Sequence, residues 1–479
     1  MIFAKRIVKV IGFLLQFLQK SYDFCYNSCK SHRTFGEDVM YREILQDLET
    51  WKDKTRRKPL ILTGVRQCGK TYIVEEFAHK NFENYIYVNF ESEETLSAIF
   101  DYDFDVDRIT RELERHFKTQ IIPGQTLVFF DEIQECTRAI TSLKYFCENM
   151  RDLHIVCAGS LLGVALKKEQ ISFPVGKVNR LQLYPMNFKE FIIANDREDL
   201  IETFREWPTD REIPQIYTKP MEDLLKAYYI VGGMPEVVKT WIETHDYNEV
   251  EEVQNEILAD YADDFSKHAP LTDVPKIRWI WDSVPVQLAK ENNKFVFSHV
   301  KKGKRSAELE DALQWLVDAG LLVKAELVEK PEIPLEGAAN KTYFKVYMSD
   351  VGLLRAKSKV SVSTILEESD LYVRYKGAFA ENYVLNEFKS IGKVPFFWRS
   401  GNSAEVDFLY EEEGRIIPVE VKSADNTQAK SYKLFCKKYN PKKGLKLSRK
   451  NIAENLCEST VTYNIPIYLG WNIDHYIMN

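Results

Sequence analysis

The chain has 479 residues, of which 45% are hydrophobic and 29% are charged, and its formal net charge is −7. A chain of this length is too long for one hydrophobic core and predicts about three domains, with the composition of a soluble globular protein. The acidic balance excludes nucleic-acid binding through overall charge, so any such binding needs a local basic patch.

The first segment, residues 1–39, is an N-terminal extension that mixes basic and apolar residues. It lacks the apolar core and small-residue cleavage site of a signal peptide, and it falls short of the roughly 20 apolar residues of a membrane-spanning helix. An amphipathic anchor on a membrane surface is one interpretation; we favour a disordered tail or a mis-assigned start site. With eight scattered cysteines typical of reduced thiols, we expect a cytoplasmic protein with no firm membrane partner.

The segment GVRQCGKT matches the pattern G-x-x-x-x-G-K-S/T at every fixed position. An apolar run precedes it and a helix-compatible stretch at 72–79 follows, which is the context of a phosphate-binding loop (P-loop). Backbone N–H groups of such a loop surround phosphate. We expect Lys70 to neutralise the β- and γ-phosphates of ATP and Thr71 to ligate Mg²⁺. The predicted nucleotide-binding residues are Gly64, Val65, Arg66, Gln67, Cys68, Gly69, Lys70 and Thr71.

Two further apolar strands end in polar residues. The run at 126–131 ends in Asp131 and Glu132, the form of a Walker B element. We expect Asp131 to hold Mg²⁺ through water and Glu132 to polarise the attacking water, and the adjacent acids are typical of the hydrolysing, additional-strand class of P-loop enzymes. The run at 153–159 is followed by Ser160, which either senses the γ-phosphate or caps the next helix.

The β-type runs predict the fold of this region. They lie around 59–64, 84–90, 126–131, 153–159 and 178–184, and helical patterns separate them. This alternation predicts an α/β fold with a doubly wound parallel sheet of five strands and nucleotide at the carboxyl ends of the strands.

Several motifs in fixed order resemble the AAA+-type ATPases of bacteria and archaea whose C-terminal half is a domain of unknown function. The resemblance runs from about Met40 to the end of the chain. It implies an ATPase core over 40–210 and a helical lid over 211–269, broken at Gly232-Gly233, that closes over the nucleotide. The similar segments are GVRQCGKT, FFDEIQ, CAGSLLG, residues 173–191, YIVGGMPE at 229–236 and ILADYADDFSKH at 257–268.

The resemblance does not identify which residue of this chain is the arginine finger. The family commonly has Gly-Arg where this chain has Gly176-Lys177, and Arg180 is the nearby candidate for contact with nucleotide. Whether the chain must form a homo-oligomer is open for the same reason.

Residues 270–355 read as helices followed by two strand-like runs, which predicts a winged-helix-like module. Its usual interpretation is DNA binding. The second predicted helix carries Glu308, Glu310, Asp311 and Asp318, which would repel phosphate. We therefore favour a module that connects domains or binds protein.

The tail, 356–479, contains a second set of candidate site residues. Glu381 lies on a predicted amphipathic helix, Asp407 on a strand, and Glu420 and Lys422 on a second strand after an acidic hairpin turn at 411–414. Glu420 and Lys422 are two apart and share a face, and antiparallel pairing would bring Asp407 to it. This order resembles restriction-endonuclease-like nucleases, which implies that the three carboxylates hold Mg²⁺ or Mn²⁺ and that Lys422 steadies the attacking water or the transition state.

Residues 430–450 hold nine lysines or arginines and no acid, as a phosphodiester substrate such as DNA would favour. The alternative is a related fold that has lost catalysis. Two functions are therefore predicted: a Mg²⁺-dependent ATPase that acts on or near DNA with a nuclease-like tail, or a nucleotide-gated module whose tail binds nucleic acid or protein without cleaving it.

Overall fold

The computed structural model describes residues 40–164, 173–290, 294–368, 370–401, 404–423 and 430–478. The N-terminal extension, with its two interpretations, lies outside these residues, and the chain from Arg42 onward forms one compact unit. Within the described ranges, no helix is both long and apolar enough to cross a lipid bilayer. The cysteines of these ranges are free thiols, nearly all of them buried.

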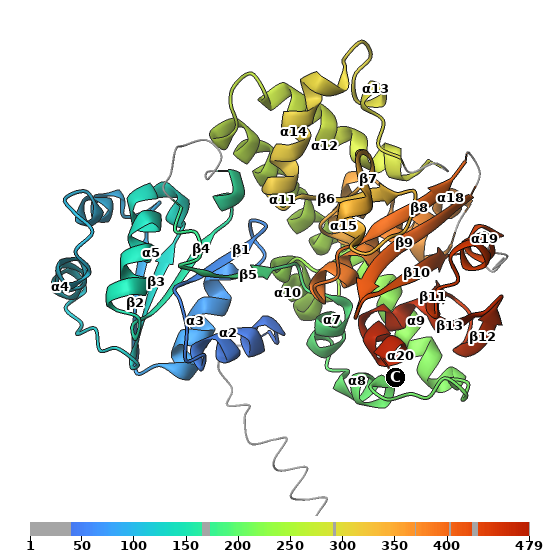
Figure 1. The fold of residues 1–479 in the computed structure, drawn as a ribbon, viewed down its shortest axis with the longest axis horizontal. Helices are drawn as coiled ribbons and strands as arrows, with labels where there is room; N and C mark the ends of the chain where they lie inside the picture. Colours follow the sequence, from blue (N-terminus) through green and yellow to red (C-terminus); the bar gives the residue numbers. More distant parts are fainter. Residues whose placement is uncertain are drawn as a thin grey trace, which may run out of the picture. The chain divides into compact units, whose positions relative to one another are not determined.

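Strand β1 and helix α3 enclose the P-loop. Strand β1 (Leu60–Gly64) is apolar and almost entirely buried, and α3 (Lys70–Asn81) begins directly after the loop. The N-cap residue of α3 is Gly69, whose φ is +89°. A residue with a Cβ is strained at this φ, so the second glycine of the motif is needed for the turn. The predicted strand, loop and helix are confirmed (Figure 1).

A five-stranded sheet carries the P-loop. Its strand order is β2-β3-β4-β1-β5, and all of its pairs are parallel. Strand β4 lies between the P-loop strand β1 and the Walker B strand β3, which is the additional strand that the two adjacent acids indicated. The remaining strands of this sheet are β2 (Asn84–Asn89), β3 (Thr126–Asp131), β4 (His154–Gly159) and β5 (Asn179–Leu183).

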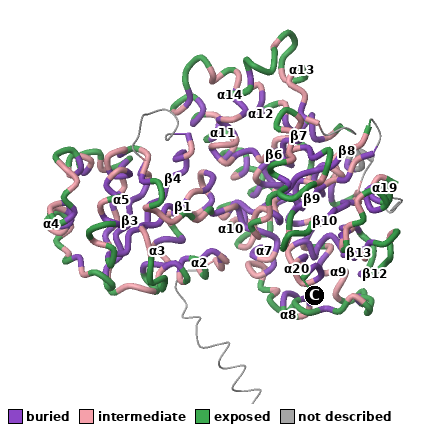
Figure 2. The backbone as a smooth tube through the Cα atoms, viewed as in Figure 1, coloured by how far each residue is buried: buried purple, intermediate pink, exposed green. Residues whose placement is uncertain are grey.

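Helices cover both faces of this sheet, so its central strands are buried on both sides (Figure 2). One face packs against an apolar cluster that includes Ile109 and Leu143. On the other side, Trp51 contacts Phe77 of α3 and His154 of β4. These helices are α2 (Ile44–Lys52), η1 (Glu94–Phe100), α4 (Val106–Phe117), η2 (Ile133–Glu135) and α5 (Thr137–Asn149).

A helical segment follows β5 and breaks at the predicted glycine pair. Gly232 has φ +78°, and a Cβ on Gly233 would lie 2.0 Å from the carbonyl oxygen of Met186. Asp350 accepts a hydrogen bond from the Gly233 N–H (2.6 Å), and Pro235 begins the next helix. The helices are α7 (Phe188–Ala194), α8 (Glu198–Phe204), α9 (Gln215–Val231), α10 (Pro235–Thr244) and α11 (Tyr247–His268).

The next segment has the predicted order of helices followed by two strands, but the strands do not form a separate wing. They pair with each other, and β6 also pairs in parallel with β8 of the C-terminal region. The two strands therefore extend the C-terminal sheet across the expected boundary at 355. The elements are α12 (Val274–Leu288), α13 (Phe297–Val300), α14 (Ser306–Asp318), β6 (Leu322–Val328), α15 (Leu335–Ala338) and β7 (Ala339–Met348).

An eight-stranded mixed sheet organises the C-terminal region, in the order β12-β13-β11-β10-β9-β8-β6-β7. The predicted acidic hairpin joins β9 and β10, with Gly414 at φ +70°. Its strands are β8 (Phe396–Ser400), β9 (Ala404–Glu412), β10 (Arg415–Lys422), β11 (Lys443–Ser448), β12 (Ala453–Cys457) and β13 (Thr460–Pro466). Its helices are α16 (Val351–Lys357), α17 (Val362–Leu366), α18 (Asp370–Ser390), α19 (Lys430–Tyr439), η3 (Ile467–Asn472) and α20 (Ile473–Met478).

Candidate nucleotide site and C-terminal carboxylate cluster

Lys70 lies over the P-loop from the first turn of α3. Its ammonium group donates hydrogen bonds to the carbonyl oxygens of Gly64 (3.1 Å) and Val65 (2.9 Å), and the side chain is buried. A Cβ on Gly64 would lie 2.4 Å from the carbonyl oxygen of Leu183, so the first glycine of the motif permits close packing of β1 against the end of β5. The loop is therefore held in shape by its own lysine.

The predicted Mg²⁺ residues are in direct contact. Thr71 Oγ1 donates to Asp131 Oδ2 (2.7 Å), which also accepts from the hydroxyl of Tyr87 (3.1 Å). Burial raises the pKa of Asp131, and the Thr71 hydrogen bond opposes this shift. Burial also raises the pKa of Tyr87 to about 12. Sequence analysis missed Tyr87. The signal that could have found Tyr87 was its position on β2, the strand that pairs with the Walker B strand β3.

Glu132 and Ser160 also lie together. Gln134 Nε2 donates to Glu132 Oε2 (2.5 Å), and Ser160 Oγ is 3.5 Å from the same oxygen. Glu132 has φ +48°, a conformation that non-glycine residues rarely adopt and that often marks functional sites. The ends of β3 and β4 thus bring the serine to the second Walker B acid, and Gln134 is a further polar neighbour that sequence analysis did not single out.

Helix α11 contacts the variable positions of the P-loop. Arg66 forms an ion pair with Asp264 (2.5 Å), and Gln67 Nε2 donates to Asp260 Oδ2 (2.7 Å). The hydroxyl of Tyr261 donates to the carbonyl oxygen of Arg66 (3.0 Å). The segment predicted as a lid is therefore bonded directly to the loop that is expected to hold phosphate.

Arg180 occupies a different part of the sheet. It pairs with Ile61 in the parallel β1–β5 ladder, whereas the P-loop begins at Gly64, opposite Leu183. This separation of three residue steps corresponds to about 10 Å along the strand. The guanidinium group is exposed and lies 4.6 Å from the centre of the Phe173 ring. The structure thus separates Arg180 from the P-loop of its own chain.

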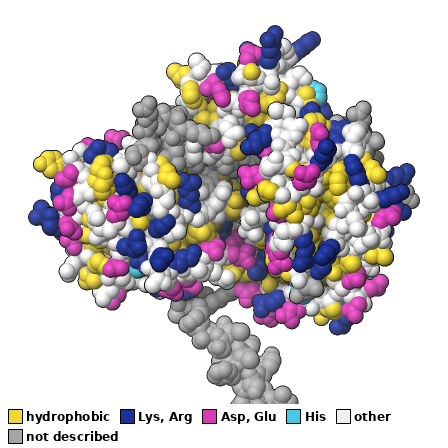
Figure 3. Space-filling view, in the orientation of Figure 1, with side chains coloured by type: hydrophobic (Ala, Val, Ile, Leu, Met, Phe, Trp, Pro, Cys, Tyr) yellow, Lys and Arg dark blue, Asp and Glu magenta, His cyan; other side chains and the backbone are white. Residues whose placement is uncertain are grey.

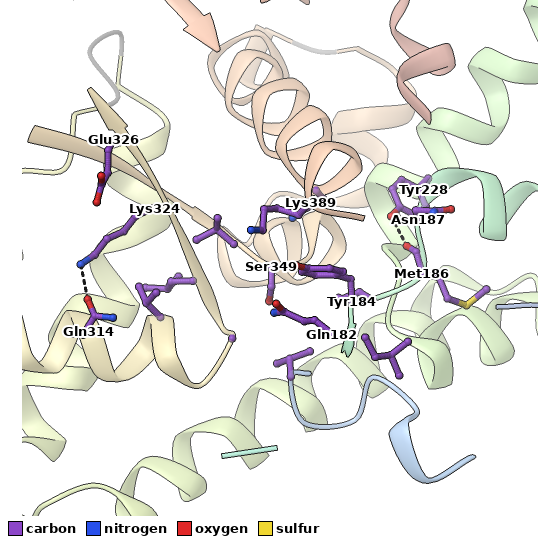
Figure 4. A pocket seen from close by; sticks show the side chains of 18 residues that line it. Gln182, Tyr184, Met186, Asn187, Tyr228, Gln314, Lys324, Glu326, Ser349 and Lys389 are labelled. Atoms are coloured by element: carbon purple, nitrogen blue, oxygen red, sulfur yellow. Dashed lines mark hydrogen bonds between the residues drawn. The ribbon is translucent and has the colours of Figure 1, made fainter. Parts of the chain in front are cut away.

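A cavity of about 400 Å³ adjoins the P-loop through Val65 (Figure 4). Its other walls come from the β5–α7 connection, α14, β6 and α18. Two hydrogen bonds stiffen these walls, from Tyr228 Oη to the Met186 carbonyl (2.6 Å) and from Lys324 Nζ to Gln314 Oε1 (3.0 Å). The candidate catalytic side chains of the P-loop and Walker B element do not line this cavity.

The C-terminal candidate residues converge from α18, β9 and β10. The β9–β10 ladder ends at the pair Val419–Phe408, one residue before Glu420 and Asp407. Beyond this point the backbone N–H of Val421 donates to Asp407 Oδ2 (2.7 Å), and Lys422 Nζ bonds to Glu420 Oε1 (2.6 Å).

Strand β7 adds two residues that sequence analysis missed. Lys345, which is 1% exposed, contacts Glu405 Oε1 (2.6 Å) and Glu381 Oε2 (3.4 Å). The hydroxyl of Tyr347 donates to Glu381 Oε2 (2.8 Å). We call Lys345, Tyr347, Glu381, Glu405, Asp407, Glu420 and Lys422 the carboxylate cluster.

Burial dominates the electrostatics of the carboxylate cluster. It raises the pKa of Asp407 far above the ordinary range, and the negative charges of Glu420 and Glu381 raise it further. Burial also raises the pKa of Glu420, while Lys422 opposes that shift. Glu420 Oε2 is buried without a hydrogen-bond partner.

Across the described ranges, His, Cys, Asp and Glu side chains nowhere form a group of three or more that is arranged to hold a metal ion. The predicted metal site of Glu381, Asp407 and Glu420 is thus not preformed. Lysines contact two of these acids, Lys345 at Glu381 and Lys422 at Glu420.

Comparisons with protein families divide the chain into three matched regions. Residues 56–192 match the model of an AAA domain, 222–364 a domain of unknown function (DUF8612), and 376–468 another domain of unknown function (DUF4143). No curated protein matches the chain. The match over 56–192 supports the coarse prediction of an AAA-type P-loop ATPase.

Solved structures give distant matches. A Walker-type ATPase of Pyrococcus abyssi is 15% identical, with 67% of this chain and 96% of that chain covered and a TM-score of 0.41. The ORC2 protein of Aeropyrum pernix is 11% identical, with 70% and 98% covered and a TM-score of 0.34. DnaA from Aquifex aeolicus is 11% identical, with 58% and 86% covered and a TM-score of 0.27.

Proposed function

We propose that this AAA-type protein is a Mg²⁺-dependent ATP phosphohydrolase. The hydrogen bond between Thr71 and Asp131 (2.7 Å) carries the proposal, because it joins a hydroxyl and a carboxylate, the hard oxygen donors that Mg²⁺ accepts directly or through water. Burial raises the pKa of Asp131, and a divalent cation beside it would favour the ionised form. Thr71 and Asp131 therefore fit a Mg²⁺ ion.

The other site residues have separable roles. Lys70 would transfer its hydrogen bonds from the loop carbonyls to the β- and γ-phosphates. Glu132 would accept the proton of the attacking water, with Gln134 and Ser160 orienting its carboxylate. Mg²⁺ would neutralise charge on the phosphates.

Phosphate release from ATP tests this proposal. Wild-type protein should release phosphate with Mg²⁺ and not with excess EDTA. Lys70→Ala should release none and should still fold, because the hydrogen bonds that it loses lie within the P-loop and not in the hydrophobic core. Undiminished turnover by a folded Lys70→Ala variant would remove the P-loop assignment.

A nucleotide-gated function, alone or coupled to hydrolysis, is favoured by the bonds between α11 and the P-loop. Phosphate bound to the loop would compete with Asp264 for Arg66. ATP should therefore change the protease sensitivity of α11, and unchanged cleavage with saturating ATP would exclude such gating.

If the chain forms a homo-oligomer, the exposed Arg180 would contact the nucleotide of a neighbouring protomer. Action on or near DNA and a cytoplasmic location remain predictions.

A second catalytic function, metal-dependent cleavage of nucleic acid, is supported by the carboxylate cluster. Glu420 is buried and Asp407 is partly buried, the pKa of each is raised, and Glu420 Oε2 has no hydrogen-bond partner. Mg²⁺ or Mn²⁺ would stabilise their ionised forms, with Glu381 as a third ligand and Lys422 released toward the phosphate. Scission of labelled DNA with Mn²⁺ tests this function. Asp407→Ala should abolish scission and spare ATP turnover, whereas equal scission by the variant would refute it.

A further inference from the structure

A hollow of about 680 Å³ lies at the eight-stranded sheet, where β6 and β8 end beside the last turn of α19. Its charged lining side chains are four cations and one carboxylate. We call this feature the basic hollow. It is a local positive patch on a chain whose net charge is −7, which is the feature that nucleic-acid binding by an acidic protein requires. The charged residues are Lys294, Lys330, Arg399, Lys438 and Glu329.

Aromatic residues contact three of the four cations of the basic hollow. Lys294 Nζ lies 3.7 Å from the centre of the Tyr343 ring, and Arg399 donates to the Tyr343 hydroxyl. Lys438 lies 5.0 Å from the Tyr439 ring. A ring fixes the position of a cation through its quadrupole and leaves the net positive charge intact. The hollow therefore offers positioned charges to a polyanion.

Strand pairing and ion pairs connect the lining of the basic hollow to the carboxylate cluster. Arg399 is paired with Glu405 across β8 and β9, and Glu405 contacts Lys345, which contacts Glu381. Tyr343 precedes Lys345 by two residues on β7, about 7 Å along the strand. The spacing between the hollow and the cluster along β7 is therefore comparable with one or two repeating units of a nucleic-acid strand.

We propose that the basic hollow binds the phosphodiester backbone of a single nucleic-acid strand and leads it to the carboxylate cluster. The proposal deepens the second catalytic function and rests on it for the fate of the strand, but binding requires no cleavage. The planar donors of Arg399 match phosphate oxygens. Lysines of α19 extend the positive charge beyond the hollow, and Figure 3 shows lysine and arginine side chains gathered at the edge of the molecule where α19 lies. Cations beside aromatic rings are typical of single-strand binding grooves.

Fluorescence anisotropy with a labelled single-stranded DNA oligonucleotide, in EDTA and over a series of salt concentrations, tests the proposal. The test variant is Lys330→Ala/Lys438→Ala. Its matched control, Lys80→Ala/Lys239→Ala, removes the same charge from exposed lysines of α3 and α10, which neither line the hollow nor belong to α19. We expect the test variant to bind about tenfold more weakly and its salt slope to fall by about 1.4, since each single-strand phosphate contact contributes about 0.7. The control should stay within about twofold of wild type.

Three results would overturn the proposal: no salt-dependent binding by the wild type, equal losses in the test and control variants, or displacement of the DNA by polyglutamate at equal charge concentration. Lys330 and Lys438 are exposed, so both variants should melt at the wild-type temperature. Because the assay contains EDTA, it is independent of scission. Hollow-dependent binding without any scission in Mn²⁺ would refute the second catalytic function and leave the binding site standing.

Discussion

Arg42 is a buried arginine that anchors the P-loop to the rest of the ATPase core, and Arg42→Ala tests this role. Its guanidinium group donates to the carbonyl oxygens of Cys68 (3.0 Å) and Tyr184 (2.6 Å). It also forms an ion pair with Glu190 (3.2 Å) in which each side chain is 5% exposed. The variant would leave a buried carboxylate without its cation and two carbonyl groups without these donors.

The expected loss of stability is large. Breaking a buried ion pair from one side costs about 3–5 kcal/mol, because the remaining charge stays buried. For a folding unit of about 150–250 residues, this corresponds to a fall in Tm of roughly 6–20 °C. ATP binding should weaken as well, because the carbonyl of Cys68 loses its tether to Arg42.

The loss of stability in Arg42→Ala should depend on pH. Burial raises the pKa of Glu190 above its ordinary value of 4.5, and Arg42 opposes this rise. Without Arg42 the folded protein would bind this proton still more tightly than the unfolded chain does. Stability would then fall as the pH rises above the unfolded pKa. The deficit in Tm should therefore be larger at neutral pH than in mildly acidic buffer.

Calorimetry and titration with a fluorescent ATP analogue measure the two effects. Arg42→Ala/Glu190→Gln is the matched control, because it removes the buried charge and leaves the tether to Cys68 broken. It should regain part of the lost Tm and none of the lost ATP affinity. A fall in Tm of less than about 2 °C in the single variant, or full recovery of ATP affinity in the double variant, would refute the reasoning.

Three further predictions follow from the site and the fold. Glu132→Gln should slow ATP hydrolysis by about 10²-fold or more, as expected for a lost general base, while ATP still binds; normal turnover would make Glu132 a supporting residue only. Deleting residues 1–39 should leave a soluble protein that binds ATP, since β1 begins at Leu60; an insoluble product would make the extension part of the fold, and membrane association lost on deletion would favour the anchor. Gly233→Ala should lower Tm strongly because its Cβ would lie 2.0 Å from the Met186 carbonyl, whereas Gly377→Ala, whose nearest neighbour would be 3.9 Å away, should not; equal melting of both variants would contradict this packing.

Local patterns in the sequence predicted most secondary-structure elements of the P-loop region. The P-loop, the five strands and the acidic hairpin at 411–414 depend on residues that are close together in the chain, such as glycines that permit a positive φ at Gly69 and Gly414. The additional strand between β1 and β3 was predicted because a P-loop motif and two adjacent acids together are typical of one class of sheet. Such signals come from backbone sterics and hydrophobic periodicity, which act over a few residues.

Only the tertiary structure decided which distant residues meet. Strands β6 and β7 joined the C-terminal sheet, which brought Lys345 and Tyr347 to Glu381. Arg42 reached Glu190, which lies 148 residues along the chain.

The sequence by itself determined the position of the P-loop and the order of the elements along the chain. It did not determine the partners of the carboxylates or the position of the basic hollow. The physical reason is that strand pairing and burial of charge depend on non-local contacts, and a strand's own pattern specifies that it pairs without specifying its partner.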